Sequence, residues 1–200
     1  MADWDANSPE LLRSVDEVGR KVNAAARNRD PLSSAAIREW QSLIMRGLTP
    51  TDGEPLGVFR GEAGLEDYIV KIGDHIGILP EFVAVELVKF DDTLAEILNE
   101  LDDRMGPEPF SEPTDGDIDA VIILCAWAHR EWVRIHPFRN GNGRTARILV
   151  NGTAQRHGLP AFISIGPRTE LEYERIAREA MAGNWEAARP LFRRLYAAAL

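Results

Sequence analysis

The sequence has a single cysteine, Cys125, among its 200 residues, which excludes an intramolecular disulfide framework. The residues around it, 120–127, read AVIILCAW and are apolar throughout. A cysteine in such a setting behaves as a small hydrophobic residue, because a low-polarity environment disfavours the thiolate. We therefore expect a buried, unreactive thiol rather than a catalytic nucleophile.

Basic residues are also scarce. The chain carries 23 Lys and Arg against 32 Asp and Glu, a net charge of −9. Binding to nucleic acid or to an anionic membrane needs a basic surface, so neither is predicted as a partner. No apolar run is as long as a membrane span, and the acidic start, MADWD, lacks the apolar core of a signal peptide. We expect a cytoplasmic protein.

Strand-forming segments are few, and apolar residues recur at helical spacing over most of the chain. The stretch after Asp117 is apolar nearly all round, which predicts a central, buried helix with Asp117 as its N-cap. The expected fold is all-α, in a single domain over 1–200, with an N-terminal helical extension over 1–34 and a core over 35–195. Helices are predicted at 8–29, 33–45, 81–101, 117–134, 144–157, 170–182 and 185–199.

Two short segments interrupt this helical pattern. Residues 56–60 and 68–72 are rich in β-branched and aromatic side chains and are separated by a stretch bounded by Gly61 and Gly64. This pattern predicts a small β-hairpin. The simplest alternative is a surface hairpin that only joins two helices.

The residues that could carry chemistry gather in one run, 136–147, which reads HPFRNGNGRTAR. The neutral imidazole of His136 can accept a proton near pH 7. Gly141 and Gly143 allow backbone N–H groups to converge on an anion at the start of a helix. On that helix Arg144 and Arg147 are three residues apart and can face the same side.

Each of these features alone is more often ordinary. A histidine before proline is usually a loop residue, a Gly-Asn-Gly sequence is usually a turn, and two arginines three apart usually form a solvated helix face. Their ordered combination at one helix start favours a site for a polyphosphate with a proton acceptor beside it.

This run resembles the signature of the Fic family, His-x-Phe-x-(Asp or Glu)-Gly-Asn-Gly-Arg-x-x-Arg. Every specified position matches except Asn140, and the resemblance extends over about residues 35–195. It implies a Fic-like helical bundle around a buried central helix, with a small β-hairpin flap over the active site. In the family this flap, here residues 56–72, docks the target protein by backbone pairing.

The resemblance implies transfer of a nucleoside monophosphate, most often AMP from ATP, to a hydroxyl side chain of a target protein, with release of pyrophosphate. His136, helped by Arg144 and Arg147, would be catalytic, with His136 deprotonating the hydroxyl. Phe138 would pin the loop to the core. The phosphates would be bound by Gly141, Asn142, Gly143, Arg144 and Arg147, with the Asn142 side chain as an additional donor.

Asn140 stands where the family carries an acid that helps to hold Mg²⁺. An amide brings only a neutral oxygen to a metal, so the sequence predicts weakened rather than absent Mg²⁺ binding. A nucleotide-binding pseudoenzyme or regulatory binding module is the alternative. A phosphotransferase like the Doc branch is less favoured, because that branch carries Ala-Asn-Lys-Arg where this chain has Gly141-Asn-Gly-Arg144.

Two residues outside the motif are further candidates for a role at the site. His129 could orient the loop that carries His136, although an ordinary core histidine is the simpler interpretation. Tyr173 could flank an adenine pocket, although the sequence alone favours other positions for it. The remaining histidines, His75 and His157, have no second His, Cys or acid at ligand spacing, so no zinc site is predicted.

Many Fic proteins are inhibited by a helix with the pattern Ser or Thr, three residues, Glu, then Gly or Asn, whose glutamate pairs with the second arginine of the motif, here Arg147. This chain has no such pattern. The resemblance therefore predicts that an inhibitory glutamate comes in trans from a small, helical, antitoxin-like partner. The alternatives are self-inhibition by oligomerisation or no such control.

Overall fold

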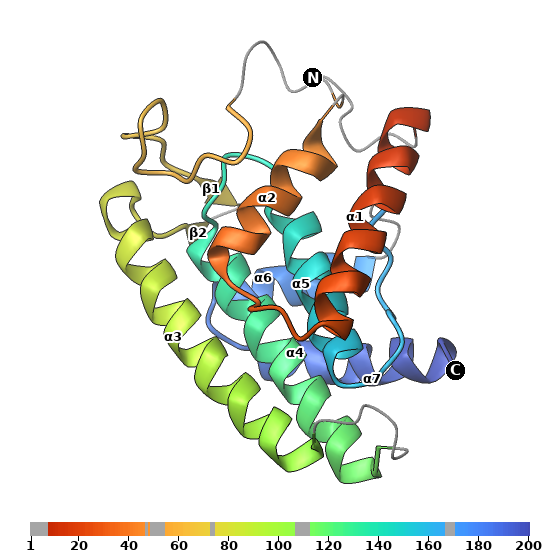
Figure 1. The fold of residues 1–200 in the computed structure, drawn as a ribbon. Coiled ribbons are helices and arrows are strands. Elements are labelled where there is room, and N and C mark those ends of the chain that lie inside the picture. Colours follow the sequence, from red (N-terminus) through yellow and green to blue (C-terminus); the bar gives the residue numbers. More distant parts are fainter. Residues whose placement is uncertain (1–7, 47, 49–54, 73–74, 107–112, 167–170) are drawn as a thin grey trace.

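The computed structural model describes residues 8–46, 48, 55–72, 75–106, 113–166 and 171–200. Within these residues the chain is mostly helical, with one hairpin of two very short strands (Figure 1). This confirms the all-α prediction. The elements are α1 (Pro9–Arg27), α2 (Ser34–Met45), β1 (Lys71–Ile72), β2 (His75–Ile76), α3 (Pro80–Met105), α4 (Asp115–Ile135), α5 (Asn142–Arg156), α6 (Leu171–Met181) and α7 (Arg189–Ala198).

The centre of the bundle is the antiparallel pair α4 and α5 (Figure 1). Helix α4 contacts α3, α5, α6 and α7, whereas α1 and α2 pack against α5. One face of α4, including Ala128 and Trp132, belongs to the larger apolar cluster, and another, including Val121 and Cys125, belongs to a second cluster. The prediction of a buried central helix is confirmed, because α4 is shared by both parts of the core.

Local sequence signals explain where these helices begin. The Ser8 side chain accepts a hydrogen bond from the backbone N–H of Leu11 at 3.1 Å, so Ser8 is the N-cap of α1 as predicted. The predicted start of α4 was wrong by three residues. Thr114 is the N-cap, and Asp117 is the third helical residue, whose carboxylate bonds back to the Thr114 N–H.

The C-terminal helix also differs from the prediction of one helix over 185–199. A 3₁₀ turn, Glu186–Ala188, precedes α7, which begins at Arg189. Pro190 lies in the first turn of α7. Proline has no backbone N–H to bond to the preceding turn, so it is tolerated in a first turn but interrupts a continuous helix.

The hairpin is present, but it is formed by other residues than expected. Strands β1 and β2 pair antiparallel, with Lys71 opposite Ile76, so residues 56–60 do not form a strand. Gly57 and Gly61 adopt positive φ angles of 67° and 89°, which turn the chain repeatedly. The backbone N–H of Arg60 donates instead to the Pro137 carbonyl at 2.7 Å. Residues 73 and 74, between the strands, lie outside the described part.

Cys125 is fully buried, and its Sγ lies 3.5 Å from the Val150 carbonyl oxygen. Burial raises the pKa of this thiol far above its ordinary value, which agrees with the expected unreactive role. None of the helices in the described ranges is long and apolar enough to cross a membrane.

Candidate active site

The motif forms the connection between the two central helices. His136 directly follows α4, and α5 begins at Asn142. Gly141 has a φ of 86°, and a Cβ added there would lie 3.1 Å from the Met45 sulfur, so this position requires glycine for both conformation and space. The N-terminal end of α5, with its positive dipole, opens onto a cavity of about 350 Å³.

The Asn142 side chain forms two hydrogen bonds with the backbone of Phe138 in the same loop. Its Oδ1 accepts from the Phe138 N–H at 2.9 Å, and its Nδ2 donates to the Phe138 carbonyl at 2.8 Å. Both polar ends of the amide are therefore used within the loop. The amide nitrogen carries two N–H donors, so its bond to Phe138 does not exclude a second bond to phosphate, and the expected role of the side chain as an additional phosphate donor stays a prediction.

Phe138 anchors the loop in the core. It is 1% exposed, and its ring centroid lies 4.9 Å from that of Phe59 and 5.9 Å from that of Trp132. The Trp132 indole donates to the Thr145 hydroxyl at 2.8 Å, which ties the same aromatic cluster to the first turn of α5. The loop is thus held from α4, α5 and the segment before the hairpin.

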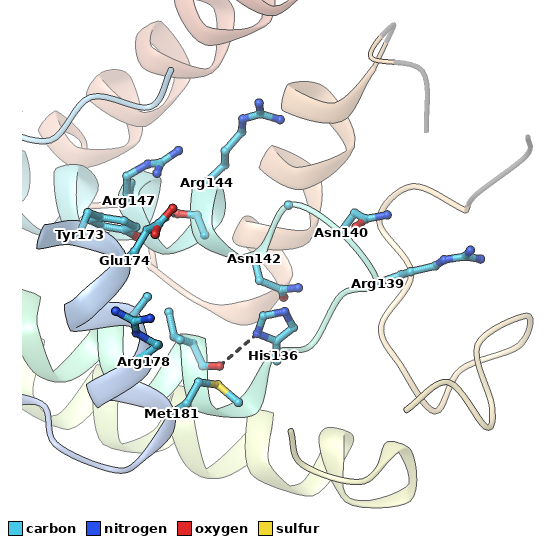
Figure 2. Close-up of a pocket in the computed structure, with 14 residues that line it drawn as sticks. His136, Arg139, Asn140, Asn142, Arg144, Arg147, Tyr173, Glu174, Arg178 and Met181 are labelled. Atoms are coloured by element: carbon cyan, nitrogen blue, oxygen red, sulfur yellow. Dashed lines mark hydrogen bonds between the residues drawn. The ribbon is translucent and has the colours of Figure 1, made fainter. Parts of the chain in front are cut away.

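The half-buried His136 lines the cavity, and its Nδ1 lies 3.2 Å from the Val133 carbonyl oxygen (Figure 2). A carbonyl can only accept, so this contact places the proton of the neutral ring on Nδ1 and leaves Nε2 as the acceptor. Burial lowers the pKa of His136 to about 4; the Val133 carbonyl opposes this shift, and the positive charge of Arg60 adds to it. The imidazole is therefore neutral at pH 7.

Arg144 and Arg147 also line the cavity, and both are buried. Arg144 Nη1 lies 3.6 Å from the Met45 sulfur, and Arg147 Nη2 donates to the Gly166 carbonyl at 3.0 Å. Both side chains extend from α5 at the cavity, and the Arg144 side chain is directed away from His136 (Figure 2). Their charges and the α5 N-terminus make this end of the cavity suited to an anion.

Sequence reasoning missed most of the opposite wall, which comes from α6. The residues of α6 that line the cavity share one helix face. Their helical spacing in the sequence was the signal that could have identified this face. They are Tyr173, Glu174, Ala177, Arg178 and Met181.

Tyr173 links this wall to the rest of the site. Its hydroxyl lies 2.7 Å from His129 Nε2 and 3.3 Å from the Gly143 carbonyl oxygen, and the Arg147 guanidinium lies over its ring at 5.1 Å. His129 therefore contacts Tyr173 rather than the loop of His136. Burial lowers the pKa of His129 to about 3, so it too is neutral at pH 7.

The described residues do not form a metal site of their own. No three His, Cys, Asp or Glu side chains within the described ranges are grouped to hold a metal ion. Asn140 lines the cavity, and its backbone carbonyl accepts from Gln41 Nε2 at 3.1 Å. Arg139 is directed away from His136, with its guanidinium 5.0 Å from the centre of the Tyr68 ring (Figure 2). Asn140 thus contributes at most one neutral side-chain oxygen to a cation.

The chain is similar in sequence to proteins of one known family. Residues 31–153 match the sequence model of the Fic/DOC family. The chain is 28% identical over 154 residues to a protein adenylyltransferase Fic from Drosophila willistoni, covering 77% of this chain and 26% of that protein. It is 42% identical over 50 residues to a uridine 5'-monophosphate transferase from Xanthomonas campestris, covering 25% of this chain and 9% of that one. The chain belongs to the Fic/DOC family.

Solved structures show the same fold. The N-terminal Fic domain of Bep8 from a Bartonella species aligns with a TM-score of 0.60 at 18% identity, over 96% of this chain and 87% of that one. BepC from Bartonella tribocorum, solved with bound AMPPNP, aligns with a TM-score of 0.56 at 18% identity, over 96% and 90%. The chain spans about a quarter or less of the length of the first curated relatives that it matches.

Proposed function

We propose that this chain transfers AMP from ATP to a Ser, Thr or Tyr hydroxyl of a target protein. The observation that carries the proposal is one cavity lined by a neutral imidazole, two buried guanidinium groups and the N-terminal end of α5. Relatives named protein adenylyltransferase, and the AMPPNP bound to BepC, support ATP as the substrate. We place the reaction in the cytoplasm, where ATP and target proteins meet.

In the proposed reaction, the target hydroxyl oxygen attacks the α-phosphorus of ATP, and its proton passes to His136 Nε2. The bond between the α-phosphorus and the oxygen that bridges to the β-phosphate breaks, and pyrophosphate leaves. The negative charge of the bound triphosphate favours the imidazolium that forms, and so opposes the effect of burial on the pKa of His136. The Nδ1 contact with Val133 orients the ring for this transfer.

Arg144 and Arg147 bind the β- and γ-phosphates in this proposal, together with backbone N–H groups of Gly141, Asn142 and Gly143. A guanidinium on the departing pyrophosphate stabilises charge that develops in the transition state. Arg147 is already oriented by the Gly166 carbonyl, so little reorganisation is needed when the phosphates arrive.

The target would dock on the segment 56–72 and the strand that follows it. A two-residue hairpin leaves backbone hydrogen-bonding groups at its edges, which an extended peptide can pair with. His75 and Ile76 of β2 are exposed, as such docking requires.

Mg²⁺ is usually held by one or two carboxylates together with substrate phosphates. Asn140 replaces the expected carboxylate, and among the described residues Glu174 is the carboxylate that lines the cavity. This same substitution favours the second candidate function, a module that binds nucleotide without transferring it.

The test is labelling of a host lysate with each of the four nucleoside triphosphates in turn, labelled at the α-phosphate. Label from ATP above that of His136→Ala supports the proposal, whereas label from UTP instead would align the chain with the uridine 5'-monophosphate transferase. A parallel reaction uses ATP labelled at the γ-phosphate, and transfer of that label to protein would indicate a Doc-like phosphotransferase. Nucleotide binding by calorimetry without any transfer would indicate the binding module.

We also propose that a small antitoxin-like partner inhibits this chain in trans, with a glutamate that competes for Arg147 with the γ-phosphate. The support is the missing inhibitory pattern in the sequence. Growth arrest on expression, relieved both by His136→Ala and by a co-expressed neighbouring small protein, would support this. Harmless expression of a fully active wild type, with no partner recovered, would contradict it.

A further inference from the structure

Arg60 is the most unusual charged residue outside the described site. It lies in the segment before the hairpin and is 1% exposed. Among the residues that the structure describes, every hydrogen bond of its guanidinium goes to a backbone carbonyl rather than to a carboxylate. Burial of a cation without a carboxylate partner costs desolvation free energy. We therefore expect the contacts of Arg60 to serve a purpose other than packing.

The contacts of Arg60 converge on the catalytic histidine. Its Nε donates to the His136 carbonyl at 2.7 Å, and its Nη2 donates to the Ile135 carbonyl at 2.8 Å. Its backbone N–H donates to the Pro137 carbonyl at 2.7 Å. One residue therefore binds three consecutive carbonyl groups at the end of α4, where carbonyls lack helical partners and the helix dipole is negative.

These bonds explain the backbone conformation of His136. Its φ of 51° and ψ of 57° lie in the left-handed region, which is unfavourable for a residue with a Cβ. Such a conformation persists only where surrounding contacts fix it. The fork of Arg60 fixes the carbonyl groups on both sides of the His136 Cα, and this sets the direction in which the imidazole leaves the chain.

Arg60 also connects the histidine to the hairpin. Its Nη1 donates to the Tyr68 carbonyl at 3.3 Å. A Cβ added at Gly77, which follows β2, would lie 3.6 Å from Arg60 Nη2 and 3.7 Å from the His136 Cβ. The chain before and after the hairpin therefore packs against the same guanidinium.

We propose that Arg60 is a positioning residue, which holds His136 in its left-handed conformation and ties it to the hairpin segment. Arg60 does not line the cavity and contacts neither phosphate nor hydroxyl in this scheme. The proposal rests on the function proposed above for its kinetic consequence, but its geometric consequence can be tested without activity.

The test compares Arg60→Met, Arg60→Lys and the matched control Arg38→Met. Met keeps the length of the side chain without its donors, and Lys keeps the charge without the fork. Arg38 lies over the Phe59 ring and pairs with Glu62, so the control removes an arginine close to Arg60 whose described contacts do not include the carbonyl groups around His136. Thermal unfolding identifies any variant that does not fold. If Arg60→Met does not fold, the measurements on Arg60→Lys alone test the proposal.

The first readout is kinetic. A displaced catalytic group costs about a hundredfold in rate, so Arg60→Met is expected to lose about that factor in kcat while KM for ATP changes little, because the arginines of α5 are untouched. The kcat of Arg60→Lys should lie between those of Arg60→Met and wild type, and the kcat of Arg38→Met should equal that of wild type. A kcat close to wild type in both folded Arg60 variants would overturn the proposal.

The second readout is the tautomer of His136, followed by the ¹⁵N chemical shifts of the imidazole and assigned with His136→Ala. Wild type and Arg38→Met should show Nδ1 protonated, whereas Arg60→Met should show an average of the two tautomers. An unchanged tautomer in Arg60→Met would overturn the proposal. If wild type transferred no nucleotide, the proposed function would fail, while this spectrum would still decide the role of Arg60.

Discussion

His129 Nε2 lies 2.7 Å from the Tyr173 hydroxyl, inside the bundle, where α4 meets α6. The same hydroxyl reaches the Gly143 carbonyl at the start of α5. This arrangement joins three helices at one point beside the cavity. It means that the wall contributed by α6 and the anion-binding end of α5 are positioned together.

Tyr173→Phe should therefore weaken nucleotide binding while leaving the fold intact. The ring under Arg147 remains, but buried His129 loses its partner, which costs about 1–3 kcal/mol. The measurement is ATP affinity by calorimetry together with thermal unfolding. Tyr196→Phe, in α7, is the matched control and should leave ATP affinity unchanged. Unaltered affinity in Tyr173→Phe would show that α5 and α6 are positioned independently.

Phe138→Ala should destabilise the protein by about 3–5 kcal/mol, the usual cost of deleting a buried phenylalanine. The affected contacts are those with Phe59 and Trp132. Urea denaturation measures the free energy of unfolding. Phe82→Ala is the control, because Phe82 is 54% exposed and surface substitutions usually change stability by about 0.5 kcal/mol or less. Equal effects of the two substitutions would contradict the anchoring role of Phe138.

The pH dependence of stability should reflect the lowered pKa of His136. Because its pKa is about 4 in the folded protein and near 6.5 when unfolded, the unfolded chain binds the proton more readily. The contribution of His136 to the free energy of unfolding is fully present above about pH 6.5 and is lost as the pH falls toward 4. His129, lowered to about 3, acts in the same direction.

Histidine NMR titration of the wild-type protein measures this directly, and His136 should remain neutral down to about pH 5. Thermal unfolding of His136→Gln should depend less on pH in this range than that of wild type. A His136 titration near 6.5 would contradict the lowered pKa that desolvation by burial gives this imidazole.

Asn140→Asp should strengthen the dependence of transfer on Mg²⁺ and raise kcat, because a carboxylate returns charge to a metal bound with the nucleotide. Asn140→Ala is the control, and its transfer rate should depend less on Mg²⁺ than that of wild type. The measurement is transfer rate against Mg²⁺ concentration. Equal or lower activity in Asn140→Asp would mean that the cavity is adapted to an amide.

The sequence predicted the bundle well because helical periodicity and the Ser8 cap are local signals. It misplaced the hairpin, because residues 56–60 are held by long-range bonds such as that between Arg60 and Pro137. The motif identified the wall formed by His136, Arg144 and Arg147. The α6 wall could not be assigned to the site from sequence, because only tertiary packing brings Tyr173 beside Gly143.

The most direct test of the proposed function is transfer of label from α-labelled ATP to protein by wild type and by His136→Ala, at matched concentration and with both shown to be folded. The account predicts labelled target protein and released pyrophosphate with wild type, and neither with His136→Ala, while both bind ATP. Equal labelling by the two proteins would contradict the role of His136 as the base that accepts the hydroxyl proton.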